Sequence, residues 1–163
     1  MGRKKQKQHK PKTAIDKIAE GIGAGLIAGF AGTIAITLSQ MLEMKIRGRK
    51  ASTVPADAAT KVLDIQPKEG KKNHFSNQVH WIYGTTWGIA RGLFGAAGLR
   101  GWSATGLHGA AVLGTAMVIE PALKVAPPIT EWSKEDIAMD VLHHAVYAIA
   151  VGLVFDAIVG DED

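Results

Sequence analysis

The chain has 163 residues, enough for one compact unit, and it contains no cysteine, so disulfide bridges and thiolate metal sites are excluded. Hydrophobic residues make up 47% of the chain, whereas the 19 Lys and Arg and the 15 Asp and Glu gather in the tails and in one loop. The net charge is +4, but the basic residues flank apolar runs and form no recognised nucleic-acid module. Basic residues in that position set membrane topology or contact anionic lipid, so we expect a lipid bilayer as a partner and no nucleic acid.

The N-terminal stretch is basic and has no apolar periodicity; it begins MGRKKQKQHKPK. This composition predicts a disordered tail over residues 1–17, followed by one membrane domain over residues 18–160. The apolar run that follows, residues 21–42, is uncharged, and no cleavage site precedes a polar mature start. We therefore predict that it stays as a first transmembrane helix.

Four segments have the length and apolar character that a spanning helix needs, which is about 20 residues. They cover residues 21–43, 78–99, 102–121 and 136–159, and Arg91 is the exception within the second. The predicted fold class is all-α, an integral membrane bundle of four transmembrane helices. The alternative, a soluble bundle of amphipathic helices, requires a charged stripe on each helix, and the first segment has none.

The long first loop contains its own helix signal in the stretch TVPADAATKVLDI. Thr53 is placed to cap a helix, Pro55 falls in the first turn and Asp57 lies near the positive end of the helix dipole. We predict a short helix here that lies on the membrane surface. Basic residues are divided almost evenly between the two sides, so charge counting does not orient the bundle. Both termini are expected in the cytoplasm, because a basic tail without a signal is hard to translocate.

Small residues recur every four positions on three of the predicted spans, and such rows let helices approach closely in lipid. They predict helix packing, either within one chain or between two copies, at Gly25, Gly29, Gly84, Gly88, Gly106 and Gly114.

The two halves of the chain also share a spacing pattern, which predicts two repeated helical hairpins. Gly29 and Glu43 in the first half match Gly106 and Glu120 in the second half. In the same way His80, Tyr83 and Gly88 match His144, Tyr147 and Gly152. Two hairpins related by an axis along the membrane normal would produce this pattern.

Ionisable residues on the predicted spans fall at one membrane side, because alternate spans run in opposite directions. We call this predicted set the polar layer, and it comprises Glu43, His80, Glu120, Asp140, His144 and Tyr147. Helical geometry places Asp140, His144 and Tyr147 on one arc, with His143 pointing elsewhere. At the opposite side Arg91 and Asp156 are predicted to form a buried ion pair, and His108 a satisfied packing residue.

The polar layer allows several interpretations, because ionisable groups at membrane depth need partners. One is a hydrogen-bonded network in which Glu43 and Glu120 accept from His80 and His144. Others are a metal site, a pathway for protons or a solute, and haem ligation. The Glu-x-x-His pair that is typical of metal sites in helical bundles is missing, so no metal and no cofactor is predicted.

Motifs of soluble enzymes, such as a nucleophile elbow, a phosphate-binding loop or H-E-x-x-H, do not occur, and we expect no enzyme. The stretches GLIAGFAGT, VPADAATKV, VHWIYGTTWG, APPITEW and DVLHHAVYAIAVGLVFD resemble the YagU-like family of small bacterial inner-membrane proteins. The resemblance covers most of residues 25–156 and implies a four-helix protein of the bacterial inner membrane, but no biochemical activity. The leading expectation is a non-enzymatic protein that packs with itself or with a larger membrane complex. The rival expectation is a small transport or proton-relay unit that uses the polar layer.

Overall fold

The fold was analysed in a computed structural model that describes residues 12–160. The predicted disordered tail therefore lies largely outside the described residues, because 1–11 are not described. Its last part is helical instead, since α1 begins at Ala14 behind a capping box. Thr13 Oγ1 accepts from the N–H of Asp16 at 3.2 Å, and the Asp16 carboxylate accepts from the N–H of Thr13 at 2.9 Å.

Helices form all of the regular secondary structure between residues 12 and 160. In chain order they are α1 (Ala14–Arg47), α2 (Val54–Leu63), α3 (Lys72–Ala96), α4 (Gly101–Ala122), the short 3-10 helix η1 (Ile129–Glu131) and α5 (Lys134–Val159). The all-α prediction is confirmed.

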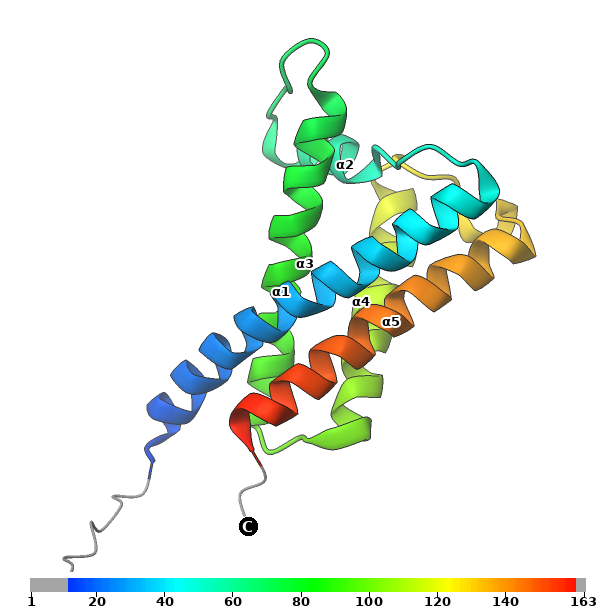
Figure 1. Ribbon diagram of the computed structural model, residues 1–163. Coiled ribbons are helices and arrows are strands. Elements are labelled where there is room, and N and C mark those ends of the chain that lie inside the picture. The colour runs from blue at the N-terminus through cyan, green and yellow to red at the C-terminus, as the bar shows by residue number, and fades with distance from the viewer. Residues whose placement is uncertain (1–11, 161–163) are drawn as a thin grey trace, which may run out of the picture.

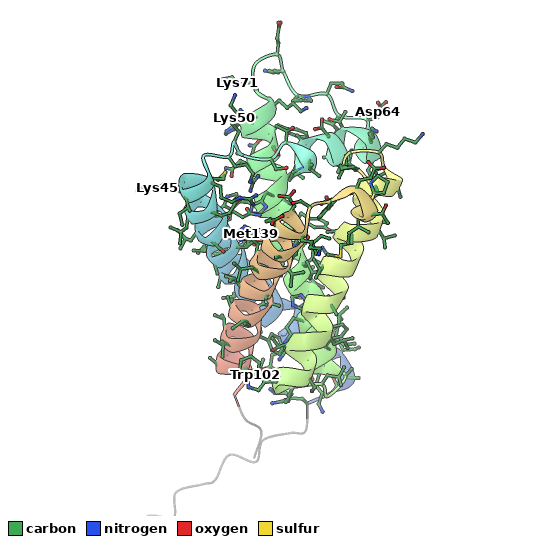
Figure 2. The ribbon with its side chains drawn as sticks, turned by 90° about the vertical axis from the view of Figure 1, so that its right-hand side faces the viewer. Lys45, Lys50, Asp64, Lys71, Trp102 and Met139 are labelled. Carbon is green, nitrogen blue, oxygen red and sulfur yellow. The ribbon has the colours of Figure 1, made fainter. Side chains whose placement is uncertain are left out.

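The four long helices run alternately in opposite directions, with α1 and α5 side by side and crossing α3 and α4 (Figure 1). One end of this bundle, the loop end, carries the last turns of α1 and α4, the first turns of α3 and α5, and α2. The other end, the turn end, carries the start of α1, the tight connection over residues 97–100 and the end of α5. Figure 2 shows Lys45, Lys50 and Met139 toward the loop end and Trp102 at the turn end.

Three of the described helices, α1, α4 and α5, are long and apolar enough to cross a membrane. Helix α3 is not among them, although its 25 residues would reach about 37 Å. Its first turns carry Asn73, His74, Asn77 and Gln78, and Arg91 lies further along. Three of the four predicted spans are therefore apolar enough to cross a membrane. Helix α3 is not, because it carries polar residues in its first turns and Arg91 inside the bundle.

Large apolar side chains lie on the outside of the bundle rather than only in its core. Ile27 and Leu38 of α1 are each 60% exposed, and Leu153 of α5 is 59% exposed. A soluble helical bundle turns its apolar stripe inward and covers the outside with charge. The outside of this bundle is therefore more apolar than that of a soluble helical bundle.

Glycines form the contact between α1 and α3. A Cβ added at Gly25 or at Gly29 would collide with the α3 backbone, at the carbonyls of Gly88 and Thr85 respectively. The contact is reciprocal, since a Cβ at Gly88 would collide with the carbonyl of Gly25, and one at Gly84 would collide with Thr33. Four of the six glycines that the sequence singled out for packing thus lie where two helices touch.

The remaining two, Gly106 and Gly114 on α4, are not at a contact within the chain. A Cβ added at either would meet no other atom within 4 Å, and both residues are exposed. Helix α4 packs on α5 through a different face, where Gly109 faces Ala148 and Thr105 faces Gly152. Their expected role in packing within the monomer is therefore corrected: spacing put them on one face, but that face looks outward.

The predicted loop helix is present as α2 and lies across the loop end, at a steep angle to the long helices (Figures 1 and 2). Thr53 precedes it but makes no side-chain cap; its hydroxyl donates instead to the Asp57 carboxylate at 3.1 Å. Ion pairing of Asp57 with Lys72 at 2.8 Å ties α2 to the start of α3. Lys61 donates to the carbonyl of Leu123 at 2.6 Å and so ties it to the end of α4.

Candidate functional site

The loop end gathers the predicted polar layer, apart from Tyr147, from all four long helices. Glu43 comes from the last turns of α1, His80 from the first half of α3 and Glu120 from the end of α4. Asp140 and His144 come from the first half of α5. This placement follows from the alternating directions of the helices, because a late residue of one helix and an early residue of the next share a depth.

Glu43 is the most deeply buried carboxylate of the layer, at 4% exposure, and its partners are arginines. Arg49 donates to both of its oxygens, with Nη2–Oε2 at 2.7 Å, and Arg47 donates at 3.2 Å. Gly48 ends α1 at φ +66°, a conformation that glycine adopts easily, and so turns Arg49 back onto the helix end. The hydrogen-bonded carboxylate of Glu43 raises the pKa of Arg49, so this pair stays charged.

The histidines of the layer bond to hydroxyl and carbonyl groups, not to glutamates. His80 Nε2 lies 3.1 Å from the Thr37 hydroxyl. His144 Nδ1 donates to the carbonyl of Asp140 at 2.9 Å and lies 3.3 Å from its carboxylate. The expected hydrogen bonds from His80 and His144 to Glu43 and Glu120 are not formed. His80 bonds Thr37 and His144 bonds Asp140 instead.

His143 was expected to point away from the layer, and the structure corrects this. Its side chain is 4% exposed, and its Nδ1 lies 2.8 Å from the hydroxyl of Ser39 on α1. Helix α5 packs on α1 along one flank and on α4 along the other. His143 and His144 lie on either side of Asp140 around the helix, so both side chains face the interior of the bundle. His143 turns toward α1, whereas His144, with a side chain 16% exposed, turns toward Glu120.

Ser39 and Thr37 are the partners that sequence reasoning missed. The sequence did contain a signal for them, because they are polar residues on a largely apolar span and lie within two turns of Glu43. A hydroxyl group in an apolar helix can donate to the backbone of its own helix, as Thr37 does to the carbonyl of Thr33 at 2.6 Å. Its presence in the sequence therefore does not by itself predict a partner on another helix.

At mid-depth, side chains of α4 and α5 donate to the backbone of α3. Tyr147 donates its hydroxyl to the carbonyl of Gly84 at 2.6 Å, and His108 Nε2 donates to the carbonyl of Trp87 at 3.0 Å. The two rings also approach each other, with centroids 5.7 Å apart. Tyr147 and His108 are almost fully buried, so they fix α3 against the other hairpin at the centre of the bundle.

Toward the turn end, Arg91 and Asp156 form the ion pair that the sequence predicts. Arg91 is fully buried and its guanidinium carbon lies 4.2 Å from the centre of the Phe155 ring. The Asp156 side chain remains 37% exposed. A buried cation is tolerable in such a place because a carboxylate and an aromatic face compensate it.

Several polar atoms in this interior have no hydrogen-bond partner within residues 12–160. They are His143 Nε2, Asp140 Oδ2, His108 Nδ1, and Nε and Nη1 of Arg91. Buried polar groups are normally bonded to protein or to water, so these atoms are the places in the bundle where ordered water is expected.

The described residues contain no group of three or more His, Asp or Glu side chains arranged to hold a metal ion. Two hollows were found on the surface, of about 400 Å³ at the loop end and about 90 Å³ at the turn end. The smaller one is lined by residues of α4 and α5, among them Trp102 and Asp156. No residue of the polar layer lines either hollow.

The fold and these contacts define a class: an all-α protein with three helices able to cross a membrane and a polar interior. Comparison of the chain with protein-family models, with curated proteins and with solved structures found no match. The resemblance to the YagU-like family stays a prediction.

Proposed function

We propose that this chain is a four-span protein of the bacterial inner membrane, in which α3 crosses together with α1, α4 and α5. Support comes from the position of α3, whose contacts with α1 are backbone-to-backbone through glycines. Its most polar residue, Arg91, is fully buried and paired. Polar residues that face a bundle interior do not prevent a helix from crossing, because the lipid never meets them.

The contacts within the two hairpins support a repeated architecture. In the first hairpin Gly88 meets Gly29, and Gly84 meets Thr33. Gly152 and Ala148 correspond to Gly88 and Gly84 by the spacing of the repeat, and their partners are Thr105 and Gly109.

By the same spacing Thr105 and Gly109 correspond to Ala28 and Gly32. The partners observed in the first hairpin are the next residues along α1, Gly29 and Thr33. The two hairpins therefore pack in nearly the same register. Both termini then lie on the side of the turn end, which we assign to the cytoplasm.

The function that this geometry supports best is non-enzymatic assembly, with a second copy of the chain or within a larger membrane complex. The observation that carries it is the outward row Gly106, Ala110 and Gly114 on α4, all of them exposed. Inside the bundle, rows of the same kind are used for close contact between α1 and α3. In lipid such rows favour helix association, since they bring two backbones together and allow extensive van der Waals contact.

The test is the mass of the purified chain in mild detergent. The parent is expected to be an oligomer, and Gly106→Leu and Gly114→Leu are expected to yield the monomer. Gly23→Leu is the matched control, because Gly23 is also exposed on a long helix and also has open space around it. A monomeric parent that carries no other membrane protein with it would contradict the proposal, as would equal effects of all three substitutions.

The rival function, a small proton-relay or transport unit, is favoured by one observation, the unpartnered atoms His143 Nε2 and Asp140 Oδ2. It requires that protons cross vesicles containing the protein, and that His143→Ala abolishes this flux. His74→Ala serves as the control, because His74 is an exposed histidine outside the polar layer. Assembly alone predicts no flux above that of empty vesicles.

A further inference from the structure

The larger surface hollow, of about 400 Å³, lies at the loop end and belongs neither to the polar layer nor to the α4 row. It is lined by Pro67, Lys68, Lys71, His74, Phe75 and Gln78. The last four recur at spacings of three and four, so they form one face of the start of α3, and the turn before the helix adds the other two.

The lysines of this hollow differ from several other basic residues nearby. Arg47 and Arg49 are bound to Glu43, and Lys72 is bound to Asp57. Within residues 12–160, Lys68 and Lys71 form no ion pair and no side-chain hydrogen bond. The acidic residue of the same turn, Glu69, does not line the hollow. Two cations thus face it without an internal counter-charge.

The backbone adds to this positive potential. The turn closes through a hydrogen bond from Lys71 N–H to the carbonyl of Lys68 at 2.9 Å, with Gly70 at φ +69°. It brings the two lysines to the same edge of the hollow. Helix α3 then starts with no side-chain cap and no acidic residue in its first turn. Its first N–H groups are therefore open to an external acceptor.

The hollow extends from the predicted membrane boundary to just beyond the level of the lipid headgroups, which its flexible lysine side chains can reach. Gln78 is the first residue of the predicted span, and Lys71 lies about 10 Å further out along α3. The polar zone of a bilayer extends roughly 5–8 Å beyond the hydrocarbon on each side. Phe75, on the same face, offers an apolar contact for the chain side of a lipid.

We propose that this hollow binds a phosphate group, either the headgroup of an anionic lipid or a free phosphate. Lys68 and Lys71 would form charge-assisted hydrogen bonds to its oxygens, and Gln78 and the first N–H groups of α3 would supply further donors. The oxygens of a phosphate can accept from donors of both the turn and the helix. The proposal depends on the membrane placement of the bundle and not on its assembly.

The experiment measures binding by native mass spectrometry of the full chain in detergent, with phosphatidylglycerol as the probe and phosphatidylcholine as the neutral comparison. The variant Lys68→Gln/Lys71→Gln is expected to lower the affinity for phosphatidylglycerol by about tenfold or more. The matched control is Lys45→Gln/Lys50→Gln, which removes the same charge at the same end of the bundle, outside the hollow (Figure 2). It should change the affinity by less than about twofold, because exposed charges outside the hollow are screened.

Inorganic phosphate, added as a competitor, distinguishes the two sources. Displacement of phosphatidylglycerol from the parent supports a site that also takes free phosphate, whereas no displacement supports a headgroup site. Equal losses in the two double variants would reduce the effect to diffuse charge and overturn the proposal. The proposal would also be overturned if neither phosphatidylglycerol nor inorganic phosphate bound the parent. All the substituted lysines are exposed, so the thermal stability of each variant should equal that of the parent.

Discussion

Single hydroxyl groups bond two histidines of this bundle, the buried His143 through Ser39 and the half-buried His80 through Thr37. A neutral imidazole bonded to a hydroxyl avoids the cost of burying two charges, which a glutamate–histidine pair would incur. Glu43, the one deeply buried carboxylate within residues 12–160, lies at the end of α1, where Arg47 and Arg49 reach it. Charge is thus kept near the ends of the bundle and neutral hydrogen bonds are used further in.

A contact can be predicted from the sequence when each residue has only one possible partner. Arg91 and Asp156 were predictable as a pair because each is an isolated charge in an apolar segment and the two fall at matching depths. His143 and His144 are adjacent, and Asp140 lies between their directions on the helix. Which of them is more deeply buried depends on the helix that packs on each flank, and spacing along α5 does not contain that information.

The contact between Ser39 and His143 leads to a prediction about stability. In a double-mutant cycle of Ser39→Ala and His143→Ala, the two substitutions should show a coupling energy of about 1 kcal/mol, the usual worth of such a hydrogen bond. The cycle of Ser39→Ala with His144→Ala should show none, because His144 bonds Asp140 on its own helix. Thermal or denaturant unfolding in detergent, monitored by circular dichroism, provides the free energies. Coupling of Ser39 to His144 instead would mean that α5 is rotated relative to the structure.

At the scale of helices, the glycine rows show both the power and the limit of a spacing argument. The rows on α1 and α3 lie in one seam, and the similar row on α4 faces outward. A period of four residues establishes which residues share a face, but the direction of that face depends on the other helices. For α4 the inner face is set by Thr105 and Gly109, which pack on α5 and which lie outside the four-residue row of Gly106, Ala110 and Gly114.

Helix lengths show a second limit, because hydrophobicity detects the part of a helix that suits lipid rather than the whole helix. The first span was expected over residues 21–43, whereas α1 extends from Ala14 to Arg47. Its ends are determined by local chemistry, the Thr13 capping box and the left-handed Gly48. The same local chemistry sets the start of α5, where Ser133 accepts from the N–H of Asp136 at 3.1 Å.

The seam between α1 and α3 leads to a prediction about single methyl groups. A Cβ at Gly25 would collide with the α3 backbone, which cannot move aside as a side chain can. Gly25→Ala should therefore destabilise the bundle by about 1–3 kcal/mol. Gly23→Ala, two residues away with open space around it, should be neutral or stabilising by up to about 1 kcal/mol, because alanine favours helix. Unfolding in detergent should rank the variants in that order, and equal stabilities would show that α1 and α3 do not meet through this row.

At the scale of the whole molecule, α3 is the helix that the others share. It meets α1 through glycines, and it accepts hydrogen bonds from Tyr147 of α5 and His108 of α4. Its polar residues include Arg91, which pairs with Asp156 inside the bundle, and they lower the hydropathy of α3 below that of the three other long helices. Helix α3, which does not meet the apolar criterion that α1, α4 and α5 meet, therefore makes contacts with all three.

Membrane crossing by α3 can be tested directly, because the chain has no cysteine and single cysteines can be introduced cleanly. Ala51 precedes α2 at the loop end, and Leu99 lies in the connection at the turn end; both are exposed. If α3 crosses, a membrane-impermeant maleimide applied to intact cells should label Ala51→Cys but not Leu99→Cys, given cytoplasmic termini. Pro127→Cys, between α4 and α5 at the loop end, should behave like Ala51→Cys. If only α1, α4 and α5 cross, no span separates Ala51 from Leu99, so these two would be labelled alike and Pro127→Cys would differ from both.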